Sequence, residues 1–164
     1  MRPISEQDLA FLDRFDLDPS ALGEFEWGGF GAAPQLRKRW QENGLLDPKE
    51  SVLMLAAGDA AAGIVSWRTV NRGGPDGVCA EIGVALLPVH RGKGIGTQAH
   101  RLLTAYVLAH TTVERLEALT DAENVAEQRV LERVGFRREG LLRHALWQNA
   151  GWRDLVIYAL LRSE

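Results

Sequence analysis

Ten residues near the middle of the chain, HRGKGIGTQA (residues 90–99), combine residue types that suit an anion. Glycine has no Cβ atom, so a glycine-rich backbone can come close to a ligand. The N–H groups at the start of a following helix would point at the same ligand. This pattern therefore predicts a phosphate-binding loop, built from Arg91, Gly92, Lys93, Gly94 and Gly96.

Two common phosphate-binding patterns fit this loop poorly. The P-loop of nucleotide hydrolases needs Ser or Thr after its lysine to hold magnesium, but Gly94 follows Lys93. The dinucleotide fingerprint needs a third glycine where Thr97 stands. Glu117 does lie at the distance expected of a ribose-binding acid, but antiparallel strands before the loop do not suit a doubly wound sheet. A nucleotide hydrolase is excluded, and a dinucleotide site is disfavoured.

The elements that position this loop follow from the pattern of apolar residues. Ser5 is expected to cap a first helix, and a second helix follows Pro34. The remaining segments show the apolar patterns of either strands or helices. We predict strands at 52–57, 62–70, 78–87, 114–120, 137–147 and 152–161, and helices at 95–110 and 124–135. This order predicts an α/β fold in a single domain (1–164), with a mixed, mostly antiparallel sheet and one βαβ unit around the loop.

The helix after the loop shows a regular apolar stripe. Its members recur at the spacing of one buried face. They are Ile95, Ala99, Leu102, Leu103, Tyr106, Val107 and His110. We expect this face to pack on the sheet, and His100 has no evident role.

The segment Arg91-x-x-Gly94-x-Gly96 resembles the acyl-CoA signature of the GNAT family of N-acetyltransferases. The similarity extends to AEIGVALLPVHRGKGIG and to DAENVAEQRVLERVGFRREGLLR followed by DLVIYALL, and it is continuous from about Val52 onward. Within the family, the chain is similar to the branch that acetylates ribosomal-protein N-termini and many small amines. The resemblance implies a GNAT-like fold, with acetyl-CoA as acyl donor.

The resemblance also implies which residues contact the coenzyme. The loop from Arg91 to Thr97 would wrap its pyrophosphate, and a splayed central strand would offer backbone groups to its pantetheine arm. Asn124 would bond to that arm, and it can also cap its own helix. The expected coenzyme-binding residues are Ile82, Gly83, Val84, Ala85, Leu86, Arg91, Gly92, Lys93, Gly94, Ile95, Gly96, Thr97, Asn124 and Glu127.

An amine can attack a thioester directly, so no covalent intermediate is required. The amine must first be neutral, which calls for a base or a water chain. Glu81, on the strand expected to carry the thioester, is the first candidate base, although it can equally be a structural carboxylate. His144 is the second, because histidine exchanges protons near pH 7.

The proton donor for the departing thiolate is not evident. Many GNAT enzymes carry a tyrosine on the helix after the asparagine, and the ribosomal-protein branch often has a serine three residues after it. This chain has Glu127 at the serine position and no tyrosine on that helix. The donor is left open between Glu127, Tyr158 and water. These departures also keep open an idle module that binds acyl-CoA without catalysis.

The acceptor is expected to meet the segment between the first helices. In EFEWGGF, aromatic residues separated by glycines and acids cannot all pack on one face, so Trp27 and Phe30 are the expected contacts. Glu24 and Glu26 would attract a cationic amine. This favours a small-molecule amine. A protein N-terminus is the alternative.

Composition limits the remaining partners. The net charge is −3 and the pI about 5.8, so nucleic acid is not an expected partner. The first residues lack the apolar run of a signal peptide, and no segment is apolar enough to cross a membrane. The single Cys79 has no cysteine partner for a disulfide or a metal site. We expect a cytoplasmic protein, a monomer or homodimer, with no metal.

Overall fold

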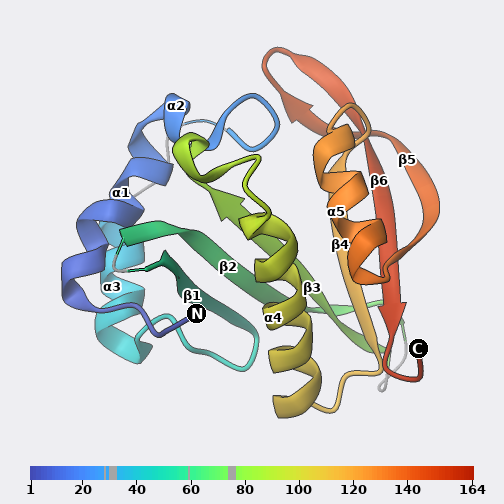
Figure 1. Ribbon diagram of the computed structural model, residues 1–164, viewed down its shortest axis with the longest axis horizontal. Coiled ribbons are helices and arrows are strands. Elements are labelled where there is room, and N and C mark those ends of the chain that lie inside the picture. Colours follow the sequence, from blue (N-terminus) through green and yellow to red (C-terminus); the bar gives the residue numbers. More distant parts are fainter. Residues whose placement is uncertain (28, 30–32, 59, 74–76) are drawn as a thin grey trace.

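The computed structural model describes residues 1–27, 29, 33–58, 60–73 and 77–164. Six strands form one sheet in the order β1-β2-β3-β4-β6-β5, flanked by helices (Figure 1). The strands are β1 (Glu50–Ala57), β2 (Ala60–Asn71), β3 (Val78–Leu86), β4 (Arg115–Asp121), β5 (Arg137–Gln148) and β6 (Gly151–Leu161). The helices are η1 (Glu6–Asp8), α1 (Leu9–Leu17), α2 (Pro19–Leu22), α3 (Ala33–Asn43), η2 (Pro88–His90), α4 (Ile95–His110) and α5 (Val125–Val134). The predicted α/β class, with a mostly antiparallel sheet, is confirmed.

The pairing of β3 with β4 is parallel, and all other neighbours in the sheet are antiparallel. α4 connects the two parallel strands, as the predicted βαβ unit requires. Along the described strands the β3–β4 register holds only two pairs, Ala80 with Leu116 and Glu81 with Glu117. Beyond them β3 still pairs with β2, as far as Leu86. The predicted splay of the central strand is therefore present, and it opens the sheet between β3 and β4.

The main core lies between the sheet and the helices α4 and α5. Alternate residues of β1 reach it, including Leu53 and Leu55, while Val52 and Met54 face the other side of the sheet. Both sides of this strand are covered, which explains why it is an uninterrupted apolar run in the sequence. Leu116 of β4 and Leu131 of α5 are fully buried in the main core.

The N-terminal helices α1 and α3 cover the opposite side of the sheet at β1. The predicted start at Ser5 is confirmed, because its amide donates to Oδ2 of Asp8 at 2.8 Å. Leu9 and Leu12 are buried in this second cluster. Trp40 of α3 packs against the cluster and donates from Nε1 to the carbonyl of Ile4 at 2.9 Å. This contact fixes α3 to the N-terminal segment, so Trp40 has a packing role.

The inner face of α4 differs from the predicted stripe. Leu102 is 44% exposed, whereas His100 is 1% exposed and Thr104 is also buried. α4 packs against α5 as well as against the sheet, so its buried face is rotated toward α5. The predictions of Leu102 and of His110, which is also exposed, as members of the buried face were wrong, because this face includes His100 and Thr104 instead.

Gly63 lies where β2 and β3 approach each other too closely for a side chain. A Cβ atom built there would lie 2.1 Å from the carbonyl oxygen of Ala85, a backbone atom of β3. We expect Gly63→Ala to lower the free energy of unfolding by about 1–3 kcal/mol, as overpacking usually does. Urea unfolding measures the change. Gly140→Ala is the matched control, since its Cβ would meet Ile157 Cγ2 at an ordinary 3.5 Å. An equal loss in both variants would contradict the prediction.

Candidate active site

The predicted glycine loop lies at the start of α4. Gly94 is the N-cap residue with φ +78°, and Gly92 has φ +70°. Side chains rarely adopt this left-handed conformation, which explains the glycines. A Cβ atom at either position would meet nothing within 4 Å, so the loop backbone is open to a ligand. α4 is 16 residues long, and its first N–H groups face the same region. The arrangement suits a phosphate.

The loop forms one wall of a cavity of about 660 Å³. The other walls come from the segment 22–26, from β3 and from α5. Nine of the residues predicted to bind a coenzyme line it: Val84, Leu86, Arg91, Gly92, Gly94, Gly96, Thr97, Asn124 and Glu127.

The other five predicted coenzyme residues lie around this cavity without lining it. Ile82 is buried in the main core, and Ile95 packs against that core. Gly83 and Ala85 alternate with the lining residues along β3, and Lys93 is exposed on the loop. Side chains alternate between the two faces of a strand, so only every second residue of β3 presents its side chain to the cavity.

β3 contributes an open backbone edge as well as side chains. Val84 and Leu86 line the cavity, on the part of β3 beyond its last described pair with β4. Backbone N–H and C=O groups there have no strand partner on the β4 side among the described residues. Such groups need hydrogen-bond partners. An extended ligand arm running from the glycine loop along β3 would supply them.

Arg91 is used differently from what its charge suggests. Its Nε donates to the carbonyl of Leu86 at 2.9 Å, and its Nη2 donates to those of Leu22 at 2.6 Å and Ala21 at 3.3 Å. The guanidinium therefore ties α2 and the end of β3 to the glycine loop. Arg91 lines the cavity, and its direct contact with a phosphate stays a prediction.

Asn124 caps α5 and faces the cavity. Its side-chain oxygen accepts a hydrogen bond from the amide of Glu127 at 3.2 Å. The predicted cap is therefore present. Gly135 ends the same helix in the left-handed conformation, also as the sequence indicates.

Glu81, the first candidate base, lies where β3 and β4 part. It belongs to the last parallel pair, opposite Glu117. Its carboxylate forms an ion pair with Arg68 of β2, at 2.7 Å, and its side chain is 18% exposed. Glu81 does not line the cavity. Arg68 and Glu81 are register partners, so their side chains share one face of the sheet.

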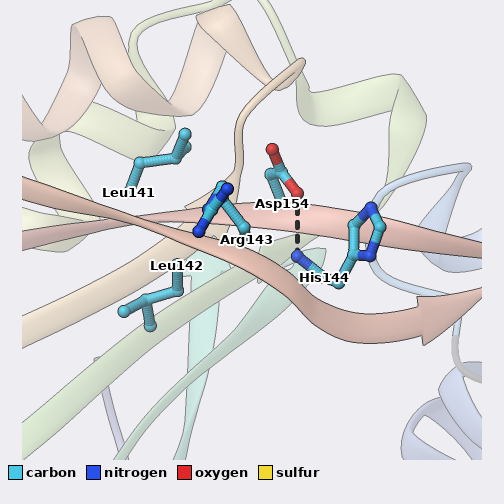
Figure 2. Close-up of a pocket in the computed structure, with 5 residues that line it drawn as sticks. All are labelled: Leu141, Leu142, Arg143, His144 and Asp154. Atoms are coloured by element: carbon cyan, nitrogen blue, oxygen red, sulfur yellow. Dashed lines mark hydrogen bonds between the residues drawn. The ribbon is translucent and has the colours of Figure 1, made fainter.

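His144, the second candidate, lies in another place. β5 bulges between Leu142 and Leu146, and His144 has φ +51° there. Its amide donates to Oδ1 of Asp154 at 2.8 Å, as the dashed line in Figure 2 shows. The ring stacks near Trp152, with centroids 6.4 Å apart. A cavity of about 600 Å³ lies here, lined by Leu141, Leu142, Arg143, His144 and Asp154 (Figure 2). The structure therefore does not bring His144 into the glycine-loop cavity.

A contact that the sequence analysis missed joins α4 to α5. His100 Nε2 lies 2.6 Å from Oε1 of Glu127, and the histidine side chain is 1% exposed. His100 falls three residues before Leu103 and seven before Val107, so helical spacing alone places it on the buried face. Its partner could not be read from the sequence, because the contact depends on how the two helices pack.

One carboxyl group that lines the cavity, that of Glu26, has a shifted pKa. Glu26 keeps part of its length exposed, but the cavity walls withdraw enough water from its carboxyl to raise its pKa to about 7. The positive charge of Arg91 opposes this shift, and the nearby carboxyl of Glu127 adds to it. Glu26 therefore changes charge close to neutral pH.

The predicted aromatic contacts are only partly described. Phe30 lies outside the described residues. The carbonyl of Trp27 accepts a hydrogen bond from Nε2 of Gln148 at 2.8 Å, and Nδ2 of Asn149 donates to the carbonyl of Glu24 at 3.1 Å. These bonds attach the segment 24–27 to the β5–β6 turn. Phe25 is the aromatic residue of this segment that lines the cavity.

Two further candidates have structural roles. Tyr158 is fully buried, and its hydroxyl donates to Oε1 of Glu132 at 3.1 Å. Burial raises the pKa of Tyr158, and the nearby Glu132 adds to the shift. Cys79 is 2% exposed, and burial raises the pKa of its thiol, as for an unreactive core cysteine.

No helix within the described residues is long and apolar enough to cross a membrane. Across the same residues, no group of three or more His, Cys, Asp or Glu side chains could hold a metal ion.

Comparisons with known proteins agree with this geometry. Residues 1–137 match the family described as Acetyltransferase (GNAT) domain. The probable N-acetyltransferase YjcK of Bacillus subtilis is 35% identical over 112 residues, which cover 68% of this chain and 61% of YjcK. The chain thus spans less than two thirds of that relative. The ribosomal-protein-serine acetyltransferase of Escherichia coli is 30% identical over 125 residues, covering 75% of this chain and 68% of that protein.

A solved structure shows the same fold. Spermidine N-acetyltransferase from Vibrio cholerae, in complex with CoA and spermine, superposes with a TM-score of 0.81 at 20% identity. The match covers 99% of this chain and 94% of that one. The family match over residues 1–137 shows that the chain belongs to the GNAT acetyltransferase family.

Proposed function

We propose that the protein binds acetyl-CoA in the glycine-loop cavity and transfers its acetyl group to the primary amine of a small molecule. One observation carries the proposal: the open loop before α4 and the free edge of β3 line the same cavity. The loop suits the pyrophosphate, and the edge suits the amides of the pantetheine arm. Bound there, acetyl-CoA supplies an activated acyl group, while Asn124 and the edge of β3 hold its arm.

The charge of the cavity wall favours a cationic acceptor. Glu24 and Glu26 both line the cavity, from the segment that the β5–β6 turn holds in place. Opposite charges raise the local concentration of a ligand at such a site. A small amine entering beside this segment would therefore be attracted as its ammonium form. It must lose a proton before it attacks the thioester, and Glu81, where β3 and β4 part, is the proposed base, acting through water because it does not line the cavity.

A protein N-terminus is the second candidate acceptor. The final hairpin exposes two large aromatic side chains, with Trp147 and Trp152 each 58% exposed. Leu141 and Leu142 are also exposed on β5. An extended polypeptide could use this apolar surface, whereas a small amine would not need it.

Release of free thiol from acetyl-CoA tests both readings. A panel of small amines is compared with short peptides that have a free N-terminus, and mass spectrometry identifies the acetylated product. Amine-dependent thiol release supports the proposed function. Preference for peptides selects the second acceptor. CoA binding without thiol release for any acceptor would support an idle acyl-CoA-binding module.

The loop assignment predicts a loss of coenzyme binding in Gly94→Val. A branched side chain there would strain the backbone at φ +78° and fill the space assigned to the pyrophosphate. We expect calorimetry to show binding of CoA but not NAD to the wild type, and no CoA binding to the variant. Gly58→Val is the matched control, because Gly58 also has positive φ and open space around it but lies in the β1–β2 turn. Unchanged CoA affinity in a folded Gly94→Val protein would contradict the assignment.

The raised pKa of Glu26 predicts a pH dependence of coenzyme binding. Near pH 7 the carboxyl passes from mostly neutral to mostly ionised, and the ionised form would repel the phosphates of bound coenzyme. CoA affinity of the wild type should therefore fall between pH 6 and pH 8 by about threefold more than that of Glu26→Gln, the size of a screened repulsion across several ångströms of water.

Calorimetry at both pH values measures this difference. Glu24→Gln removes a carboxylate from the same wall and should keep the pH dependence of the wild type. Parallel pH profiles for wild type and Glu26→Gln would show that Glu26 does not change charge in this range.

The proposed base predicts a rate defect in Glu81→Gln. The amide keeps the shape of the side chain but cannot accept the proton, so the rate at pH 7 should fall on the order of 10²-fold or more. Part of it should return at higher pH, because more of the amine is then already neutral. Acetyl-CoA affinity should stay unchanged. Steady-state rates from pH 6 to pH 9 test this, with the exposed Glu123→Gln as control. A wild-type rate across the range would exclude Glu81 as the base.

A further inference from the structure

The carboxylate of Glu127 is held at the cavity by a buried histidine. Glu127 lies in the first turn of α5, lines the cavity and has a side chain that is 27% exposed. Its Oε1 lies 2.6 Å from Nε2 of His100, whose side chain is 1% exposed. The second oxygen, Oε2, has no hydrogen bond within the described part of the chain. One oxygen is therefore fixed, and the other is available to a ligand.

The other ring nitrogen of His100 determines where protons can lie. Nδ1 is buried and has no hydrogen-bond partner within the described chain. A proton there would leave a buried N–H group unpaired, which is unfavourable, and more so on a charged ring. With Nδ1 unprotonated, Nε2 is the nitrogen that donates to Oε1, and Oε2 of Glu127 is left as the carboxyl oxygen beside the cavity that can hold a proton.

We infer that Glu127, positioned by His100, donates a proton from Oε2 to the sulfur that leaves when the thioester breaks. The inference rests on the proposed function. In the balanced step, the amine nitrogen forms its bond to the acetyl carbon and gives up one proton to the base. The C–S bond breaks and its electron pair goes to sulfur. Glu127 supplies the proton that completes the thiol, and it is reprotonated from solvent through the cavity.

The surroundings of Glu127 favour it over the other candidate donor. The hydroxyl of Tyr158 is buried and already donates to Glu132. Glu127 shares the cavity with two other carboxyls, on Glu24 and Glu26, and with the positive charges of Arg91 on the loop and of Arg129 and Arg133 on α5.

The first test uses the protein without any ligand. Because the His100 ring is buried and Nε2 is close to Oε1, its N–H proton should give an imidazole signal in nuclear magnetic resonance that exchanges slowly with solvent. Glu127→Ala should abolish the signal, and Glu132→Ala, on the same helix, should keep it. No such signal in the wild type, or its survival in Glu127→Ala, would overturn the pairing.

The second test measures turnover with acetyl-CoA and an amine that the wild type accepts. Glu127→Gln should lower kcat by about 10²-fold, the usual effect of losing a general acid. Its KM for acetyl-CoA and its affinity for CoA should stay within about twofold, because the amide keeps the size of the side chain. Glu132→Gln serves as control and should keep the wild-type kcat. A wild-type kcat in Glu127→Gln would overturn the inference.

Two variants of His100 distinguish its role in positioning Glu127 from a role in packing alone. His100→Leu keeps the site apolar but removes the donor to Oε1, so kcat should fall while the melting temperature changes little. His100→Gln restores an N–H donor without a group that titrates, and it should recover most of kcat. Failure of this recovery in a folded protein would contradict the positioning role. A wild type that releases no thiol with any acceptor contradicts the proposed function, whereas an active wild type with an unimpaired Glu127→Gln contradicts only the proton donor.

Discussion

The parting of β3 from β4 is the constraint on which the rest of this structure depends. Two strands that stay in one sheet but stop pairing leave a row of backbone groups without partners, which is costly unless something else pairs with them. Here the described parallel register ends at Glu81 and Glu117, while the other side of β3 remains paired with β2 to Leu86. The opening is held apart by α4 and α5, which pack on the same face of the sheet and against each other. The unpaired backbone groups of β3 therefore form a binding site even before any side chain is considered.

The side chains then divide the work between structure and chemistry. Arg91 looks like a phosphate ligand in the sequence, but its bonds to three backbone carbonyls make it a brace between α2, β3 and the glycine loop. His100 looks like an ordinary helix residue, but it is buried against a carboxylate of the cavity wall. Charge or residue type alone does not distinguish a ligand-binding role from a structural role, whereas the hydrogen-bond partners of each side chain do.

Most of the fold could be predicted from the sequence because its signals are local. The apolar runs gave the strands, the glycines and caps gave the helix ends, and the spacing around Gly94 gave the loop. The failures involve contacts between distant elements. Leu102, predicted to be buried, is exposed, and His100, outside the predicted stripe, is buried, because α4 packs against α5 as well as the sheet. The raised pKa of Glu26 depends on its burial in the cavity and on the carboxyl of Glu127, far away in the chain.

The attachment of the segment 24–27 to the β5–β6 turn has a consequence for how ligands enter. Its two side-chain hydrogen bonds join residues that are 121 and 125 positions apart in the chain. Each such bond contributes only about 1 kcal/mol net, against about 5–15 kcal/mol for unfolding a whole domain. Breaking them would cost far less than unfolding the sheet, so this wall of the cavity can loosen locally while the strands stay paired.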